Sequence, residues 1–185
     1  MRRLCVAIVL GVGLLHGQQS QGGLIQFGKV SIRYYKLDYS QFKGEIREVE
    51  TRGIRGFPVR VESPEQYFTL TCARLKATLG PDTQRRPAVR TAEAIGQVEF
   101  VYNRPQPLSK LNGTAQRVLY DDQKRTVTLE GDVSLDGEDE FYFIRWRDNE
   151  RIVVYLEEEL QRVEATAKMR DGAPIGVMTI EPKKQ

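Results

Sequence analysis

The sequence predicts an all-β domain built from antiparallel strands, and three features of the chain support this fold class. Apolar and polar residues alternate with a period of two in several short segments, which is the spacing of a half-buried strand. Residues that favour turns separate these segments at the spacing of hairpins. A seven-residue pattern that contains a glycine occurs twice. The 185 residues are enough for one ordinary domain.

The first residues have the composition of an export signal. Arg2 and Arg3 precede an apolar run over residues 4–15, and a stretch rich in Gln, Gly and Ser follows. This run is shorter than the roughly 20 residues that a membrane-spanning helix needs. We therefore expect residues 1–17 to be a cleaved signal peptide, with an uncleaved anchor as the alternative. We expect residues 18–28 to be a flexible linker.

Nine segments of the remaining chain have the character of strands. In the clearest one, residues 127–135, apolar residues such as Val127 and Leu129 alternate with polar ones. The others are rich in β-branched and aromatic residues, which fit a pleated, half-buried surface. The nine segments are residues 30–34, 57–61, 67–75, 98–102, 115–120, 127–135, 141–147, 152–156 and 175–180.

Turn signals join several of these segments. Residues 121–124, 136–139 and 148–149 place turn-forming side chains between two predicted strands, which favours consecutive antiparallel pairing. Residues 80–90 and 103–107 contain prolines and show no hydrophobic period, so we predict loops there.

One segment also fits a helix. Apolar residues near residues 157–168 have helical spacing and lie among strong helix formers. These residues are Leu156, Leu160, Val163 and Ala167. We keep a short helix near residues 157–168 as an alternative to a strand.

The scarce residue types exclude several kinds of active site. His16 is the single histidine and lies in the predicted signal, so the exported chain has none for a catalytic triad or a zinc site. Cys5 lies there too, and we expect the remaining Cys72 to be a buried apolar residue. Without Arg2 and Arg3, 26 basic residues face 25 acidic ones, a balance that argues against binding nucleic acid. We expect no enzyme activity and no cofactor.

Charged clusters fit solvated surface better than ligand sites. The acidic residues at 121–122, 136–140 and 157–159 lie in or near predicted turns, and none has the ligand spacing of a calcium loop. We therefore expect no metal site. Arg85, Arg86 and Arg90 fit a mobile basic loop, with contact to anionic headgroups as the alternative.

The repeated pattern is an apolar residue, any residue, Gly, a polar residue, Val, any residue and an apolar residue. It occupies residues 94–100 and 129–135, which places Gly96 and Gly131 35 positions apart. A glycine inside a strand indicates a bend or a close backbone approach, so both glycines are candidate structural positions. Residues 113–121, which end in a Tyr-Asp turn, lie between the two copies.

This order of features resembles the OstA-like β-jellyroll of bacterial lipopolysaccharide-transport proteins, the LptA and LptC class. The similarity is greatest over residues 91–135, whereas residues 24–56 match no part of the family pattern and Gln97 replaces the usual Asn or Asp. The resemblance implies an open, V-shaped antiparallel β-jellyroll over residues 29–181, with a tail at 182–185. It also implies a periplasmic location, an apolar interior that holds acyl chains, and sheet edges that pair with related domains.

One apolar face is the candidate lipid-binding site. It carries Val98, Phe100, Val127, Leu129, Val133 and Leu135. An open groove lined by these residues would bind acyl chains through the hydrophobic effect, but a sealed β-sandwich has the same sequence pattern.

We therefore predict a non-enzymatic component that shields the acyl chains of lipopolysaccharide, or of a similar glycolipid, and relays it toward the outer membrane. The alternatives are an LptC-like protein anchored in the inner membrane and a structural adaptor without a lipid groove.

Overall fold

The computed structural model describes residues 22–41, 47–81, 87–106, 108–156 and 161–183. This part of the chain is almost entirely β-structure, with one short 3-10 helix, η1 (Pro64–Gln66). The prediction of an all-β fold is confirmed. The predicted signal at residues 1–17 lies outside the described residues. Within the described part, no helix is long and apolar enough to cross a membrane.

Four long strands form the centre of the sheet. They are β8 (Pro87–Arg104), β9 (Ser109–Asp121), β10 (Thr126–Glu138) and β11 (Tyr142–Leu156), and each pairs antiparallel with the next. The turn at residues 121–124 joins β9 to β10, as predicted. The pairing register shifts near the middle of the strands, which marks a bend.

Each central strand therefore belongs to two half-sheets. The first half-sheet contains β3 (Lys36–Gln41), β4 (Arg47–Arg52), β7 (Arg74–Pro81), one half of each central strand, and β12 (Gln161–Ala167). The second contains β1 (Gly23–Phe27), β2 (Val30–Tyr34), β5 (Val59–Ser63), β6 (Phe68–Cys72), the other halves, and β15 (Val177–Pro182). One core cluster contains buried side chains from both half-sheets, so they face each other.

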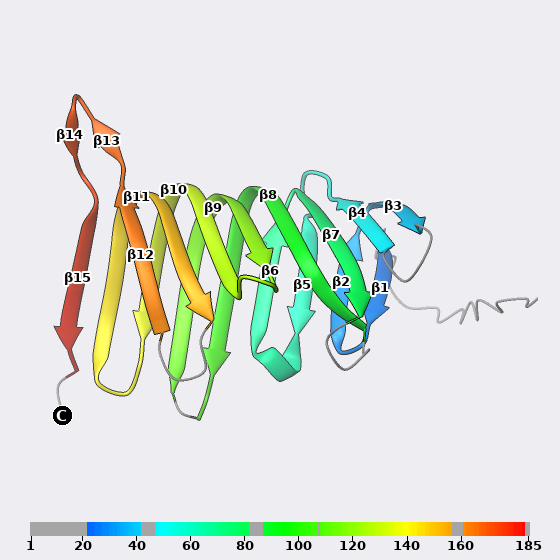
Figure 1. The fold of residues 1–185 in the computed structure, drawn as a ribbon, viewed down its shortest axis with the longest axis horizontal. Helices are drawn as coiled ribbons and strands as arrows, with labels where there is room; N and C mark the ends of the chain where they lie inside the picture. Colours follow the sequence, from blue (N-terminus) through cyan, green and yellow to red (C-terminus); the bar gives the residue numbers. More distant parts are fainter. Residues whose placement is uncertain (1–21, 42–46, 82–86, 107, 157–160, 184–185) are drawn as a thin grey trace, which may run out of the picture.

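The bends form a line along one long side of the molecule, and the turns at the strand ends lie along the opposite side (Figure 1). We call these the bend line and the turn side. Backbone hydrogen bonds continue along the bend line, from Tyr35 N to Arg52 O (2.9 Å), from Gly53 N to Ala73 O (2.8 Å) and from Lys168 N to Asp148 O (2.9 Å). A small hairpin of β13 (Met169–Arg170) and β14 (Ala173–Pro174) projects from this side.

The two copies of the glycine pattern lie at bends. In β8, Gly96 has φ 82° and Gln97 φ 46°, and in β10, Gly131 has φ 74° and Asp132 φ 50°. Positive φ suits glycine because it has no Cβ to clash with the backbone. The sequence repeat thus marks equivalent points of two long strands that flank β9, as expected for a bend.

Two sequence predictions at the bend line need correction. Asp148 and Asn149 do not form a turn between strands, because β11 continues through them and bends at Asp148, which has φ 54°. The predicted strand over residues 67–75 is divided into β6 and β7 at Ala73, whose N–H donates to the carbonyls of Ile95 and Gly96. The sequence indicated a turn at residues 148–149 and an unbroken strand over residues 67–75, and pairing with neighbouring strands decides the form of both segments.

Several predicted boundaries also move because strands extend into predicted loops. Gly80 and Pro81 belong to β7, and residues 87–90 belong to β8, while residues 82–86 lie outside the described part. Strand β10 continues to Glu138, so its turn lies closer to Phe141 than predicted. Strand β8 continues to Arg104.

The N-terminal boundary differs as well. Residues 23–27, which lie in the predicted linker, form β1. Strands β2, β3 and β4 come from the stretch that matches no part of the family pattern, residues 24–56. At the other end, Pro182 belongs to β15 rather than to a tail.

The helix alternative near residues 157–168 is wrong over residues 161–167, which form β12. Residues 157–160 lie outside the described part. Strand β12 pairs with β11, where Val163 is opposite Val154 and Arg162 opposite Tyr155. The Arg162 guanidinium also lies 4.6 Å from the centre of the Tyr155 ring. Pairing with β11 satisfies backbone groups of both strands, which outweighs helix propensity.

Candidate functional site

The six predicted lipid-binding residues lie together between the two half-sheets. Val98, Phe100, Leu129, Val133 and Leu135 are buried members of the main core cluster, and Val127 is half-buried against it. Val98 and Val133 have no exposed surface, and Leu129 and Leu135 are 1 % exposed. The structure therefore brings all six into one apolar interior, whose centre is filled by their own side chains.

Gly113 makes this close packing possible. It is paired with both Phe100 and Leu135 in the register of the sheet. A Cβ at Gly113 would lie 2.3 Å from Leu135 Cδ2 and 2.5 Å from the Phe100 ring. The two large side chains thus occupy the space over the glycine. The sequence offered little sign of this role, because Gly113 precedes a threonine in an irregular polar segment.

The repeat glycines have steric roles besides their positive φ. A Cβ on Gly96 would lie 3.0 Å from Ala73 Cβ, and one on Gly131 would lie 2.9 Å from Gln116 Cβ. Gly96 and Gly131 are therefore structural positions at the bend line, where neighbouring segments approach closely.

The apolar interior face continues onto the last strands, where it is exposed. On β15, Met178 is opposite Trp146 and Ile180 is opposite Ile144, so both extend the core face. Met178 is 52 % exposed and Ile180 is 55 % exposed. Val163 of β12 continues the facing half-sheet and is also exposed. None of these three residues is among the six predicted lipid-binding residues, although residues 175–180 were predicted as a strand.

The opposite end of the interior is covered. A second apolar cluster contains Val49, Ala77 and Leu79 of the first half-sheet. Ile25 of β1 packs against this cluster and against the main one, and Phe27 packs against the second cluster. Strand β1 therefore connects the half-sheets at the N-terminal end.

The interior also contains a buried cysteine and a buried threonine hydroxyl. Cys72 is a free, buried cysteine, and burial raises the pKa of its thiol to about 12. The thiol stays protonated at neutral pH and is a poor nucleophile. Thr51 Oγ1 is buried without a hydrogen-bond partner. The described residues contain no group of three or more His, Cys, Asp or Glu side chains that could hold a metal ion.

The acidic clusters in the described part stabilise turns and strand ends. Asp121 accepts a hydrogen bond from Lys124 N (3.0 Å), and Asp139 accepts two from the backbone N–H groups of Phe141 and Tyr142 in its own turn. Glu138 binds Lys110 and Lys183, which holds the pKa of its carboxyl below the usual range. Arg90 donates to Asp122 (2.8 Å), so this arginine anchors a turn. The acidic residues at 157–159 lie outside the described part.

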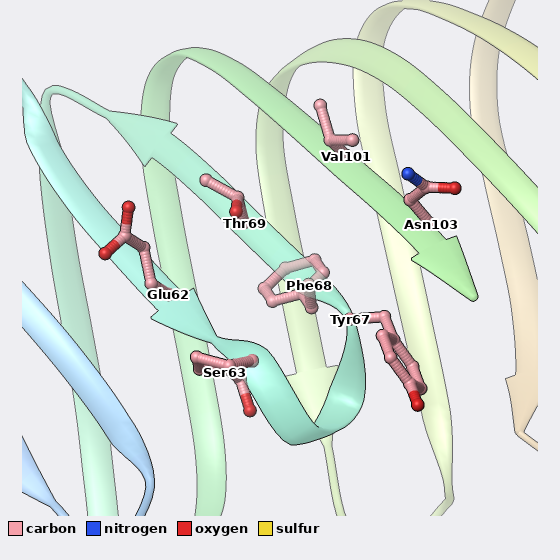
Figure 2. A pocket seen from close by; sticks show the side chains of 8 residues that line it. Glu62, Ser63, Tyr67, Phe68, Thr69, Val101 and Asn103 are labelled. Atoms are coloured by element: carbon pink, nitrogen blue, oxygen red, sulfur yellow. The ribbon is translucent and has the colours of Figure 1, made fainter. Parts of the chain in front are cut away.

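A shallow recess of about 470 Å³ lies on the outer face of the second half-sheet (Figure 2). Thr69 and Val101 line it, and they alternate with the core residues Leu70 and Phe100, so the recess faces away from the interior. Tyr67 and Asn103 border it near η1. This recess is separate from the candidate lipid-binding face.

A solved structure shares the fold of this chain. The crystal structure of LptH from Pseudomonas aeruginosa, described as the LptA-homologous periplasmic component of the conserved lipopolysaccharide transport device, aligns with a TM-score of 0.53. The alignment covers 83 % of this chain and 95 % of that chain at 15 % sequence identity. No protein-family model matches the chain, and no curated protein does. The LptA-like fold inferred from the sequence resemblance is therefore confirmed.

Proposed function

We propose that this protein binds the acyl chains of lipopolysaccharide, or of a similar glycolipid, and relays it across the periplasm. The observation that carries the proposal is the apolar interior face that continues, uncovered, onto β12 and β15. Removing apolar surface from water contributes about 25 cal/mol per Å². The likeness of the fold to a component of a lipopolysaccharide transport device supports the same function.

In this proposal the acyl chain first contacts the exposed residues of the C-terminal end, Val163, Met178 and Ile180. The six core residues, from Val98 to Leu135, form the deeper wall of the same face. They contact lipid when the half-sheets separate on the turn side. The bend line stays intact because its backbone hydrogen bonds connect neighbouring strands.

Aspartate substitutions on β15 test this proposal. We expect Met178→Asp and Ile180→Asp to abolish photocrosslinking to labelled lipopolysaccharide, because a carboxylate on this face opposes an acyl chain. Both positions are more than half exposed, so the fold should melt as in the wild type. Val177→Asp is the matched control, since Val177 is 55 % exposed on the other face of the same strand. Unchanged crosslinking in the folded Met178 and Ile180 variants would contradict the proposal.

The relay requires contact with related domains, which we place at the sheet edges. In the described part, β1 and β15 each pair on one side, as do β3 and β12. Free strand edges can pair with another β-domain through backbone hydrogen bonds. We expect concentration-dependent oligomers in sedimentation velocity runs. A strict monomer at high concentration, without crosslinked partners in the cell envelope, would count against the relay.

From the predicted signal peptide we propose that the mature chain lies in the periplasm, with its N-terminus near Gln18. N-terminal sequencing of envelope-derived protein tests this assignment. Met1 or Arg2 at the terminus of a membrane-bound form would favour the anchored, LptC-like alternative.

A structural adaptor is the second candidate, and the densely packed centre favours it. Val98, Val133 and Ile152 have no exposed surface, so the described side chains fill the middle of the interior. A native mass spectrum of protein purified from its own envelope separates the two functions. A co-purifying lipid supports the carrier, and its absence together with failed crosslinking supports the adaptor.

A further inference from the structure

Exposed aromatic side chains gather on the turn side of the second half-sheet. Among the described residues, six aromatic side chains are conspicuously exposed, and four of them lie at or beside turns of this half-sheet. These four are Tyr67 (45 %), Phe141 (64 %), Tyr142 (44 %) and Phe143 (39 %). The turn that carries Phe141 and the turn formed by η1 lie along the same side of the molecule (Figure 1). Exposed apolar groups that cluster in this way mark an interaction surface.

The turn before β11 holds its aromatic residues in a fixed arrangement. Asp139 Oδ1 accepts hydrogen bonds from the backbone N–H groups of Phe141 and Tyr142, both at 2.7 Å. Asp139 N donates to Tyr142 O (3.1 Å), and Lys183 N donates to Phe141 O (2.8 Å). The backbone N–H and C=O groups of Phe141 and Tyr142 therefore have partners within the protein. A segment that enters an apolar medium needs this, because unpaired backbone groups are costly there.

The aromatic residues surround the tip of this turn. Tyr142 and Phe143 are consecutive residues of a strand and point to opposite faces, while Phe141 lies at the tip. The Phe141 and Tyr142 ring centres are 6.4 Å apart, at an angle of 57°. A rigid protein partner would cover one face of such a turn, whereas lipid can surround all of it. This arrangement favours a lipid interface.

Tyr67 supplies a second point on the same side. It has φ 55°, a conformation that few non-glycine residues adopt, and its ring remains exposed beside the outer recess (Figure 2). Tyrosine suits the membrane interface because its ring is apolar and its hydroxyl is polar.

The charges near these aromatic residues are largely paired. Glu138 binds Lys110 and Lys183, and the Lys183 ammonium lies 5.0 Å from the centre of the Phe143 ring. Lys29 pairs with Glu65 beside η1. Binding of this surface to a membrane would therefore be driven mainly by insertion of apolar side chains and not by attraction to anionic lipids.

We propose that the turn side of the second half-sheet inserts Phe141, Tyr142, Phe143 and Tyr67 into the interface of a lipid bilayer. The surface would place the domain on a membrane with its strand ends toward the lipid. This inference concerns bilayer contact by the aromatic turns and does not require a glycolipid in the interior.

Tryptophan substitutions test the insertion directly. In the full chain, we expect the emission of Phe141→Trp to shift to the blue with zwitterionic phosphatidylcholine vesicles, and brominated phosphatidylcholine to quench it. The native Trp146 is buried and gives the same background in every variant. Tyr39→Trp is the matched control, because Tyr39 is 51 % exposed on the edge strand β3. Equal quenching of both probes, or of neither, would overturn the proposal.

A binding measurement completes the test. We expect Phe141→Ser combined with Tyr142→Ser to lower partitioning into the same vesicles by about tenfold, with little dependence on salt. Tyr35→Ser combined with Tyr39→Ser should leave partitioning unchanged, and the apolar run over residues 4–15 is common to both variants. Equal partitioning of the two double variants would overturn the proposal.

Photocrosslinking to lipopolysaccharide separates this inference from the carrier function. Both proposals hold if the Phe141 and Tyr142 double variant still crosslinks in detergent but partitions about tenfold less into vesicles. Only the insertion proposal is contradicted if lipopolysaccharide crosslinking persists and the Phe141→Trp probe is not quenched. Only the carrier function is contradicted if the Phe141→Trp probe is quenched and the wild-type protein does not crosslink to lipopolysaccharide.

Discussion

At the N-terminal end of the sheet, Ile25 packs against both apolar clusters, whereas at the C-terminal end Met178 and Ile180 remain more than half exposed. Both ends are built from strands with the same alternating pattern. They differ because side chains of β1 pack against the apolar clusters of both half-sheets. Among the described strands, none pairs with the outer edge of β12 or β15. The comparison teaches that an apolar strand face becomes core or binding surface according to what packs over it.

The largest loss of stability should come from a substitution at the centre of the interior, between the two ends. Leu129→Asp buries an unpaired carboxylate at a position that is 1 % exposed, with an expected cost of several kcal/mol. We expect loss of the cooperative thermal transition by circular dichroism. Val163→Asp, on an exposed position of β12, is the control and should melt close to the wild type. A cooperative melt of the Leu129 variant would show that water reaches the centre.

A second prediction compares the two ends directly. Ile25→Ala should lower the free energy of unfolding by about 2 kcal/mol, because Ile25 contacts both clusters. Ile180→Ala, at an exposed position on the matching face of β15, should change it by less than about 0.5 kcal/mol. Urea denaturation measures both values. Equal losses would mean that β15 is covered in solution, for example by a second copy.

The smallest effect concerns the pH dependence of the C-terminal end. Hydrogen bonds from Lys183 and Lys110 lower the pKa of Glu138 below its ordinary value of 4.5. Because the pKa of Glu138 is lower in the folded state than in the unfolded state, its carboxylate stabilises the folded state at pH values above the ordinary pKa. This stabilisation is lost as the pH falls through the lowered pKa. The protection of the β15 amides against hydrogen exchange, relative to their intrinsic rates at each pH, should therefore fall in acid more than that of the β1 amides. Glu138→Gln should remove the difference, and Glu140→Gln in the same turn should not.

The sequence alone determined many of the local elements of this protein. Period-two alternation located most strands, the repeated pattern located the bends at Gly96 and Gly131, and the turn at residues 121–124 was correctly placed. Cys72 is buried as expected for a small apolar residue. These features depend on residues close in the chain, where side-chain alternation and glycine conformation act directly.

Only the tertiary structure decided how these elements continue and what covers them. Asp148 is a bend rather than a turn because β11 pairs on both sides of it, and residues 161–167 form a strand because β11 offers them backbone partners. Gly113 matters because two distant side chains meet over it. Alternation shows that a strand has an apolar face, but the partner of that face comes from elsewhere in the chain. The sequence therefore predicted the residues of the interior, while their packing at the centre and exposure at the C-terminal end depended on contacts between strands far apart in the sequence.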